Sequence, residues 1–208
     1  MSLFRLHAIF SSLQGEGRNV GRPATFIRFS SCNLACAWCD TNKSERMVLS
    51  EHQIVEKVAE EGIKSVIITG GEPSIQPDLE VLVRALKENG RWVALETNGV
   101  RAPACIDLFD YVAVSPKGDY RSRYLDATML RKADEMRIVA TSEELLPFCE
   151  MMRNRIQATD YYISPLEKDG KIHYRRAVNL QARLNRNSPG LLPPWSLSIQ
   201  MHKVLGLR

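Results

Sequence analysis

Short apolar runs of strand character alternate with longer segments of helical spacing over most of this chain, and this alternation limits the possible folds more than any other feature. The expected strands are residues 24–30, 65–69, 92–96, 111–115, 135–139, 161–164 and 197–200. The expected helices are residues 50–61, 77–89, 141–155 and 174–184. Strands and helices in alternation require a mostly parallel sheet with right-handed crossovers.

The number of these units decides between the parallel architectures. Six or seven units in 208 residues are too few for a closed eightfold barrel. We therefore predict an α/β fold, a partial (open) TIM-like barrel of about six mainly parallel strands with helices outside, with an open wound sheet as the alternative. No repeat or Pro/Gly-rich linker interrupts the chain, so residues 1–208 are expected to form a single domain.

Two of the expected helices carry recognisable ends. Ser50 and Gln53 have capping-box spacing at the start of the first helix, and Gly62 follows its end. Pro77 lies at the start of the second helix, and Gly90 ends it.

Charge and hydropathy exclude several classes of protein. A formal net charge of +4 comes from 28 basic and 24 acidic residues spread along the chain without a dense Lys/Arg block, so no nucleic-acid partner is expected. No run approaches the roughly 20 apolar residues that a membrane helix needs. The first residues also lack the features of a signal peptide. We expect no membrane partner and a cytoplasmic location.

Three of the five cysteines lie close together in SCNLACAWCDT, residues 31–41. Cys32, Cys36 and Cys39 have the spacing C-x3-C-x2-C, which calls for a chemical explanation. Cys105 and Cys149 stand in apolar sequence and are expected to be buried thiols without chemistry.

Three interpretations of the cysteine cluster differ in how many ligands they need. Structural zinc takes four ligands, so a distant cysteine or histidine would have to join the three. A redox pair would use Cys36 and Cys39 and leave Cys32 without a role. A [4Fe–4S] cluster suits soft thiolates, and three ligands leave one iron open to a substrate or cofactor. The pattern favours the iron–sulfur cluster.

The cysteine motif after a first strand, together with ITGGEP at residues 68–73, resembles the radical S-adenosylmethionine (SAM) superfamily. The resemblance implies that Cys32, Cys36 and Cys39 hold a [4Fe–4S] cluster whose open iron binds SAM. It also implies that Gly70 and Gly71 contact SAM. Glycines at a strand end allow the main chain to approach a ligand where a Cβ would collide.

Further motifs narrow the resemblance. FSSLQGEG (10–17), CDT (39–41), ETNG (96–99), VSPK (114–117) and MHKVLGLR (201–208) are similar to the 7-carboxy-7-deazaguanine synthase family. The resemblance implies a carbon–nitrogen lyase of queuosine and 7-deazapurine biosynthesis. Such an enzyme converts 6-carboxy-5,6,7,8-tetrahydropterin to 7-carboxy-7-deazaguanine with release of ammonia, by a radical ring contraction carried by the cofactor rather than by a catalytic side chain. The implied cofactors are [4Fe–4S], SAM and Mg2+. The implied partners are the pterin, a second copy in a homodimer and a flavodoxin- or ferredoxin-type electron donor.

The same resemblance implies residue roles. The expected cofactor contacts are Trp38, Cys39, Asp40, Gly70, Gly71, Ser115, Pro116, Lys117, Ser164 and Pro165. Many relatives have Gln where this chain has Ser164. The expected substrate contacts are Leu13, Gln14, Gly15, Glu16, Arg28, Thr69, His202 and Arg208, with the C-terminal segment folded back to the substrate. Thr41 is the expected Mg2+ ligand, because a hard cation prefers oxygen.

Strand alternation alone also predicts on which face of its strand Arg28 lies. It should lie on the face opposite Ile27 and Phe29. A cation on the inside of a barrel must be paired, either with a structural carboxylate or with a substrate carboxylate. The family resemblance favours the substrate.

Two rival functions make different demands on the sequence. An activase that installs a glycyl radical shares the cysteine spacing but usually carries further cysteine clusters. A zinc-stabilised nucleic-acid module requires a clustered basic face and a fourth ligand. The sequence shows neither. Because the motifs follow strands, we expect them to meet at the carboxyl ends of the sheet, with Thr41 and Thr69 at the same end.

Overall fold

A curved sheet forms the centre of the computed structural model, which describes residues 2–41, 44–187, 190 and 193–206. Its strands in spatial order are β11 (Trp195–Leu197), β8 (Gln157–Pro165), β7 (Lys132–Ala140), β6 (Tyr111–Val114), β5 (Trp92–Thr97), β4 (Ser65–Gly70), β2 (Pro23–Phe29), β1 (Leu3–Leu13) and β3 (Met47–Ser50). A separate hairpin joins β9 (Glu167–Lys168) and β10 (Lys171–Ile172).

The sheet is parallel from β2 to β11 and is not closed, because β3 and β11 are its two edges. Strand β1 pairs antiparallel with β2, and β3 pairs antiparallel with β1. The prediction of an open, mainly parallel α/β barrel is therefore confirmed, with seven parallel strands in the described sheet rather than about six.

The antiparallel strand β1 was not predicted. Its first residues alternate between exposed and buried, with Phe4 and Leu6 inside. The register then shifts between Leu6 and Ala8, so the alternation changes phase. The last predicted strand was placed too late, because β11 occupies residues 195–197 instead of 197–200.

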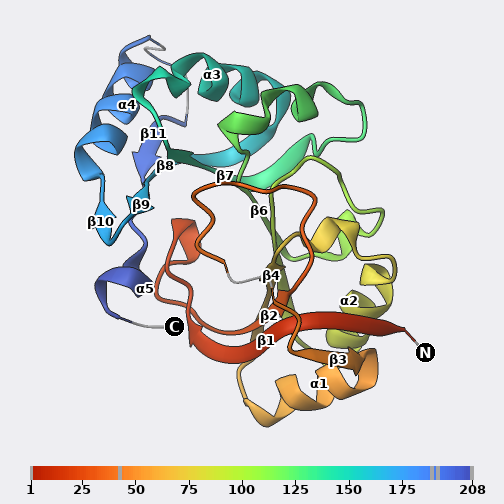
Figure 1. Ribbon diagram of the computed structural model, residues 1–208. Helices are drawn as coiled ribbons and strands as arrows, with labels where there is room; N and C mark the ends of the chain where they lie inside the picture. The colour runs from red at the N-terminus through yellow and green to blue at the C-terminus, as the bar shows by residue number, and fades with distance from the viewer. Residues whose placement is uncertain (1, 42–43, 188–189, 191–192, 207–208) are drawn as a thin grey trace.

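Helices α1 (Glu51–Glu60), α2 (Leu79–Glu88), α3 (Leu146–Arg155) and α4 (Tyr174–Asn187) pack outside the sheet, as predicted (Figure 1). The capping box of α1 is formed, since the Ser50 side chain accepts from the Gln53 amide and the Gln53 side chain accepts from the Ser50 amide. Gly62 follows α1 with a left-handed φ of +69°. A fifth, short helix, α5 (Met201–Val204), was not predicted.

The main core lies between the outer face of the sheet and the helices. It contains Ile27 and Phe29 of β2, and it also contains Cys105 and Cys149, which are 6% and 0% exposed as predicted. In the described part of the chain, no helix is long and apolar enough to cross a membrane.

The inner face of the sheet changes character along the strands. Near the strand starts it is apolar, and Phe10 and Phe26 stack there with 5.2 Å between ring centres. Two residues further along β4 and β5, the inward positions hold Thr69 and Glu96, and β7 adds Arg137. The fold thus places polar side chains inside the barrel at the carboxyl ends of the strands, where ligands bind in open α/β sheets.

Candidate functional site

Two adjoining open cavities of about 180 and 460 Å3 lie at the carboxyl ends of the strands. The first, called here the cysteine cavity, is lined by the three clustered cysteines, and the second, the Arg28 cavity, by Arg28 and residues 13–16. Both are lined by Glu16, Asp40, Thr41, Thr69, Glu96, Glu167, Gln200 and Lys203. Because Thr41 and Thr69 line the same cavities, the predicted convergence of the motifs is confirmed.

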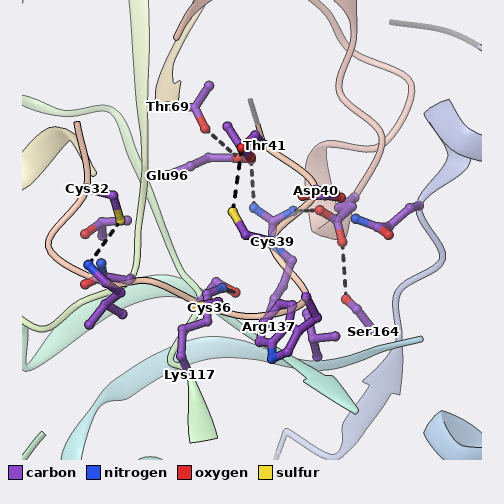
Figure 2. Close-up of a pocket in the computed structure, with 18 of the residues that line it drawn as sticks. Cys32, Cys36, Cys39, Asp40, Thr41, Thr69, Glu96, Lys117, Arg137 and Ser164 are labelled. Carbon is purple, nitrogen blue, oxygen red and sulfur yellow. Dashed lines mark hydrogen bonds and ion pairs between the residues drawn. The ribbon is translucent and has the colours of Figure 1, made fainter. Parts of the chain in front are cut away.

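Cys32, Cys36 and Cys39 face the cysteine cavity from one loop, and none forms a disulfide (Figure 2). The Leu34 amide donates to Cys32 Sγ at 3.4 Å. Cys39 is exposed, whereas the other two are half-buried. Three accessible thiols around one open space are the ligand set of an iron–sulfur cluster with an open iron.

The structure gives no support to the zinc alternative. Cys105 and Cys149 are buried in the core away from the loop, so neither supplies a fourth ligand. Among the described residues, no three His, Cys, Asp or Glu side chains converge on the position of a single ion.

Hydrogen bonds from neighbouring elements position the cysteine loop. The Ala35 amide donates to Tyr120 Oη at 3.0 Å, and Trp38 Nε1 donates to Asp119 at 2.9 Å. Tyr120 and Asp119 belong to a 3-10 segment, Gly118–Leu125. On the opposite side, Asn98 Nδ2 donates to Asn33 Oδ1 at 2.8 Å.

The glycines of TGGEP are required for a reason that differs from the expected contact with a cofactor. A Cβ on Gly71 would lie 2.0 Å from the carbonyl oxygen of Ser31, and a Cβ on Gly70 would lie 2.2 Å from the amide nitrogen of Phe29. The glycines therefore allow the turn after β4 to pack against the main chain at the end of β2. Both also line the cysteine cavity, so their contact with a cofactor stays a prediction.

Glu72 of the same motif ties two strand ends together. Its carboxylate, 1% exposed, accepts from the Ser74 amide at 3.0 Å, from Thr97 Oγ1 at 2.6 Å and from the Asn98 amide at 2.7 Å. Burial raises the pKa of Glu72 although these bonds oppose the shift. Sequence reasoning gave this residue no role.

Lys117 of VSPK points into the cysteine cavity. Its Nζ donates to Ser115 Oγ at 2.7 Å and lies 5.4 Å from the centre of the Trp38 ring. Burial lowers the pKa of Lys117, although nearby acidic groups oppose the shift. Ser164 and Pro165 line the same cavity. Pro116 is buried and lines neither of the two cavities, so its contact with a cofactor stays a prediction.

The Arg28 cavity brings together most of the expected substrate contacts, namely Leu13, Gln14, Gly15, Glu16, Arg28, Thr69 and His202. Arg28 lies on the inner face, opposite Ile27 and Phe29, as alternation predicted, and its guanidinium carbon is 5.4 Å from the centre of the Phe10 ring. Arg208 lies outside the described residues.

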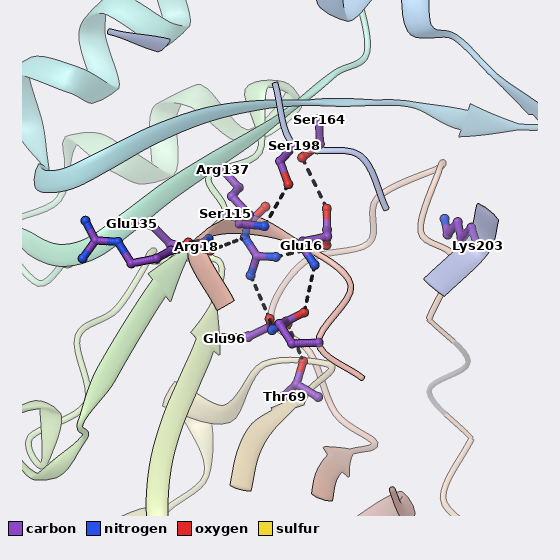
Figure 3. Close-up of polar contacts among 12 residues, drawn as sticks. Glu16, Arg18, Thr69, Glu96, Ser115, Glu135, Arg137, Ser164, Ser198 and Lys203 are labelled. Atoms are coloured by element: carbon purple, nitrogen blue, oxygen red, sulfur yellow. Dashed lines mark hydrogen bonds and ion pairs between the residues drawn. The ribbon is translucent and has the colours of Figure 1, made fainter. Parts of the chain in front are cut away.

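A buried ion network between the cavities centres on Arg137 (Figure 3). Its guanidinium contacts Glu16 at 3.2 Å, Glu96 at 2.8 Å and Glu135 at 2.9 Å. The Arg137 side chain is only 6% exposed, whereas those of Glu16 and Glu96 are 19% and 24% exposed. The two more accessible carboxylates thus offer hydrogen-bond acceptors to a ligand.

The network also anchors the loop that follows β1. Glu135 accepts from the Arg18 amide at 2.9 Å and from Tyr111 Oη at 2.7 Å. Gly17 has a φ of +66°, and a Cβ there would lie 2.2 Å from the Glu135 carboxylate. Ser164 Oγ donates to Glu16 at 3.3 Å. A residue larger than glycine at position 17 would therefore separate Glu16 from its partners.

Arg137, Glu96 and Glu135 are site residues that the sequence reasoning missed. A signal was available, because Glu135 and Arg137 alternate with Met136 and Ile138 in one strand. Charged residues at every second position of an otherwise apolar strand indicate a polar interior face. Burial acts to raise the pKa of Glu96, but Arg137 and the hydrogen bonds to the carboxylate outweigh it and lower that pKa.

The C-terminal segment folds back over the site, as the family resemblance implied. The Met201 amide donates to the Gly15 carbonyl at 2.9 Å. His202 packs against Gly15, where a Cβ would lie 2.0 Å from His202 Nδ1. Lys203 Nζ contacts Asp40 at 2.5 Å and Glu167 at 2.7 Å.

Comparison with known proteins agrees with this geometry. The radical SAM superfamily model matches residues 26–160. A 7-carboxy-7-deazaguanine synthase of Haemophilus influenzae is 44% identical over 98% of this chain and 94% of that protein, and one of Neisseria meningitidis is 43% identical over the same shares. This chain belongs to the 7-carboxy-7-deazaguanine synthase family of radical SAM proteins. The crystal structure of QueE from Escherichia coli has a TM-score of 0.72 at 25% identity, covering 96% of this chain and 95% of that one.

A radical SAM protein requires a [4Fe–4S] cluster and SAM, and the residues of the cysteine cavity fit both. The three thiols supply soft ligands from one loop. The adjoining wall offers polar groups around an open space, and it is formed by Gly70, Gly71, Glu72, Glu96, Thr97, Asn98, Ser115 and Lys117. Thr41 and Asp40 supply oxygen atoms of the kind that Mg2+ prefers.

Proposed function

We propose that this protein is a 7-carboxy-7-deazaguanine synthase, which converts 6-carboxy-5,6,7,8-tetrahydropterin to 7-carboxy-7-deazaguanine with release of ammonia. Relatives with that activity in their names match the chain over nearly its whole length. The observation that carries the proposal is the double cavity, in which the cysteine loop and the Arg28 side share one wall.

On the cofactor side, Cys32, Cys36 and Cys39 would hold the cluster, with Thr41 as the ligand of Mg2+. The cluster and SAM, when bound, supply the one-electron chemistry that starts the ring contraction. Lys117 brings a cation to this side, and its bond to Ser115 fixes its direction. The expected cofactor contacts other than Pro116 line this cavity, and all of them, Pro116 included, remain part of the proposal.

On the substrate side, the charges match the two ends of a carboxypterin. Arg28 is the cation that would bind the substrate carboxylate, which a guanidinium recognises through paired hydrogen bonds. Glu16 and Glu96 would accept hydrogen bonds from the amino-pyrimidine edge, which is rich in donors. Gln14 Nε2 donates to Glu96 at 2.7 Å and holds that carboxylate in place.

Three broader parts of the proposal have only the family resemblance and the composition of the chain as support. They are a homodimer, an electron donor of the flavodoxin or ferredoxin type, and a cytoplasmic location. None of them enters the argument for the reaction.

The test is an anaerobic assay with reconstituted protein. Iron, sulfide, dithionite, SAM, Mg2+ and 6-carboxytetrahydropterin are combined, and 7-carboxy-7-deazaguanine is followed by mass spectrometry. Product that disappears in Cys36→Ala but persists in Cys105→Ala, whose cysteine is buried outside the cavity, supports the proposal. Cleavage of SAM without any change in the pterin would contradict the substrate and leave the superfamily chemistry intact.

A further inference from the structure

Lys203 lies at the junction of three segments that are far apart in the sequence. It belongs to α5, and its Nζ contacts Asp40, next to Cys39 in the cysteine loop, and Glu167 in the β9–β10 hairpin. The Lys203 side chain is only 18% exposed, and lysines are rarely so buried unless an opposite charge pairs with them. Lys203 thus bridges two carboxylates with a single ammonium group.

The residues just before Lys203 contact the other cavity. Met201 donates to the Gly15 carbonyl, and His202 packs on Gly15 inside the Arg28 cavity. The four-residue helix α5 therefore contacts the substrate loop through two residues and the cysteine loop through the next one. In Figure 3, Lys203 lies on this short helix apart from the Arg137 network.

A helix of four residues has too few internal hydrogen bonds to hold itself in place. The position of α5 must therefore come from tertiary contacts. Two of these contacts are the ion pairs of Lys203 with Asp40 and Glu167. With these pairs removed, α5 keeps the Met201 bond and the His202 contact, both of them on the substrate side.

We propose that Lys203 is a positioning residue that fastens α5 to the cysteine loop, so that closure of the substrate side depends on an ordered cofactor side. The inference deepens the proposed function and rests on it where it names the pterin. Its reciprocal consequence is that SAM on the cofactor side strengthens pterin binding, because a coupling between two sites acts in both directions.

Two readouts test the proposal on the reconstituted holoenzyme. Hydrogen exchange measures the protection of residues 200–206 with and without SAM, and steady-state kinetics separates KM for the pterin from kcat. In Lys203→Met, tail protection should fall and no longer respond to SAM. KM should rise about tenfold, the scale of losing a charged hydrogen bond, while kcat changes less than twofold.

Lys168→Met is the matched control, because Lys168 is an exposed lysine on the same hairpin as Glu167. It should behave as the unaltered protein in both readouts. Lys203→Arg should restore part of the protection, since a guanidinium can also bridge two carboxylates. Where Lys203→Met does not fold, Glu167→Gln removes one arm of the clamp and should give a smaller loss of the same kind.

Tail protection and KM that stay unchanged in Lys203→Met would overturn the proposal, as would a fall in kcat with KM unaffected. The exchange readout needs no turnover. If the unaltered protein converts no pterin, the proposed function fails. The role of Lys203 in fastening α5 is still tested, because it is measured by the hydrogen-exchange protection of residues 200–206.

Discussion

Replacing Arg137 by methionine should destabilise the protein strongly, because it leaves one buried and two partly buried carboxylates without their cation. The three carboxylates lie 2.8–3.2 Å from the guanidinium, which is 6% exposed. Removing one partner of a buried ion pair costs about 3–5 kcal/mol. We expect a loss near the upper end, a large part of the roughly 5–15 kcal/mol that stabilises a domain.

The loss should depend on pH in a defined direction. In the unaltered protein the pKa of Glu96 is lowered, so its contribution to stability is present above the ordinary value of 4.5 and is lost as the pH falls through the lowered value. In Arg137→Met, the hydrogen bonds from Gln14 and Thr69 remain, but burial is no longer opposed by the cation, so the pKa of Glu96 should rise. The penalty is then present at high pH and shrinks as the pH falls towards 4.5, by about 1.4 kcal/mol for each unit of upward shift.

Urea unfolding of the apoprotein at pH 8 and pH 5.5, followed by tryptophan fluorescence, measures both effects. Arg84→Met is the control, because Arg84 pairs with Glu80 on the exposed surface of α2 and should cost less than about 1 kcal/mol. Adding Glu96→Gln to Arg137→Met should recover part of the stability. A loss below about 1 kcal/mol in Arg137→Met, or a loss that is equal at both pH values, would refute the reasoning.

Three further predictions concern single residues. Gly71→Ala should abolish SAM binding measured by calorimetry on the reconstituted protein and cost about 1–3 kcal/mol in urea unfolding, because its Cβ would force the main chain away from Ser31. Unaltered SAM affinity would contradict this. Ser50→Ala should cost about 1 kcal/mol through loss of the α1 cap, with activity retained, and a thermal melt that does not move would show that the capping box is dispensable. Burial lowers the pKa of His202, so the contribution of its neutral form is fully present above 6.5 and is lost as the pH falls through the lowered value. The free energy of unfolding, measured with urea, should therefore fall between pH 7 and pH 5.5, and a His202→Asn variant should show a smaller fall.

The parallel strands and the outer helices could be predicted because their signals are local. Apolar periodicity and end signals such as Ser50 and Gly62 act within a few residues of the element that they define. Strand β1 was not predicted, because the register shift between Leu6 and Ala8 breaks the alternation of buried and exposed residues in the middle of the strand. His7 is also buried there.

The same distinction between local and long-range signals applies to the candidate site. The cysteine loop and TGGEP could be recognised because each motif is contiguous in the sequence. The Arg137 network could not, since Arg137 and Glu96 are 41 residues apart and only the barrel brings them together. The reason for Gly71 was also missed, because the collision that it avoids is with Ser31, forty residues earlier in the chain.

The loop after β1 must wait for its partners while the chain is made. The Gly17 amide donates to Ser198 Oγ, 181 residues later, and Gly15 accepts from Met201. At about 5–20 residues per second, roughly 10 to 35 seconds of translation separate the two sides of these bonds. The parallel sheet can begin to form during this interval, but the pocket cannot. Closure of the binding site therefore waits until residues 198–201 have been made, and a nascent chain released before residue 198 would carry the cysteine motif without a closed site.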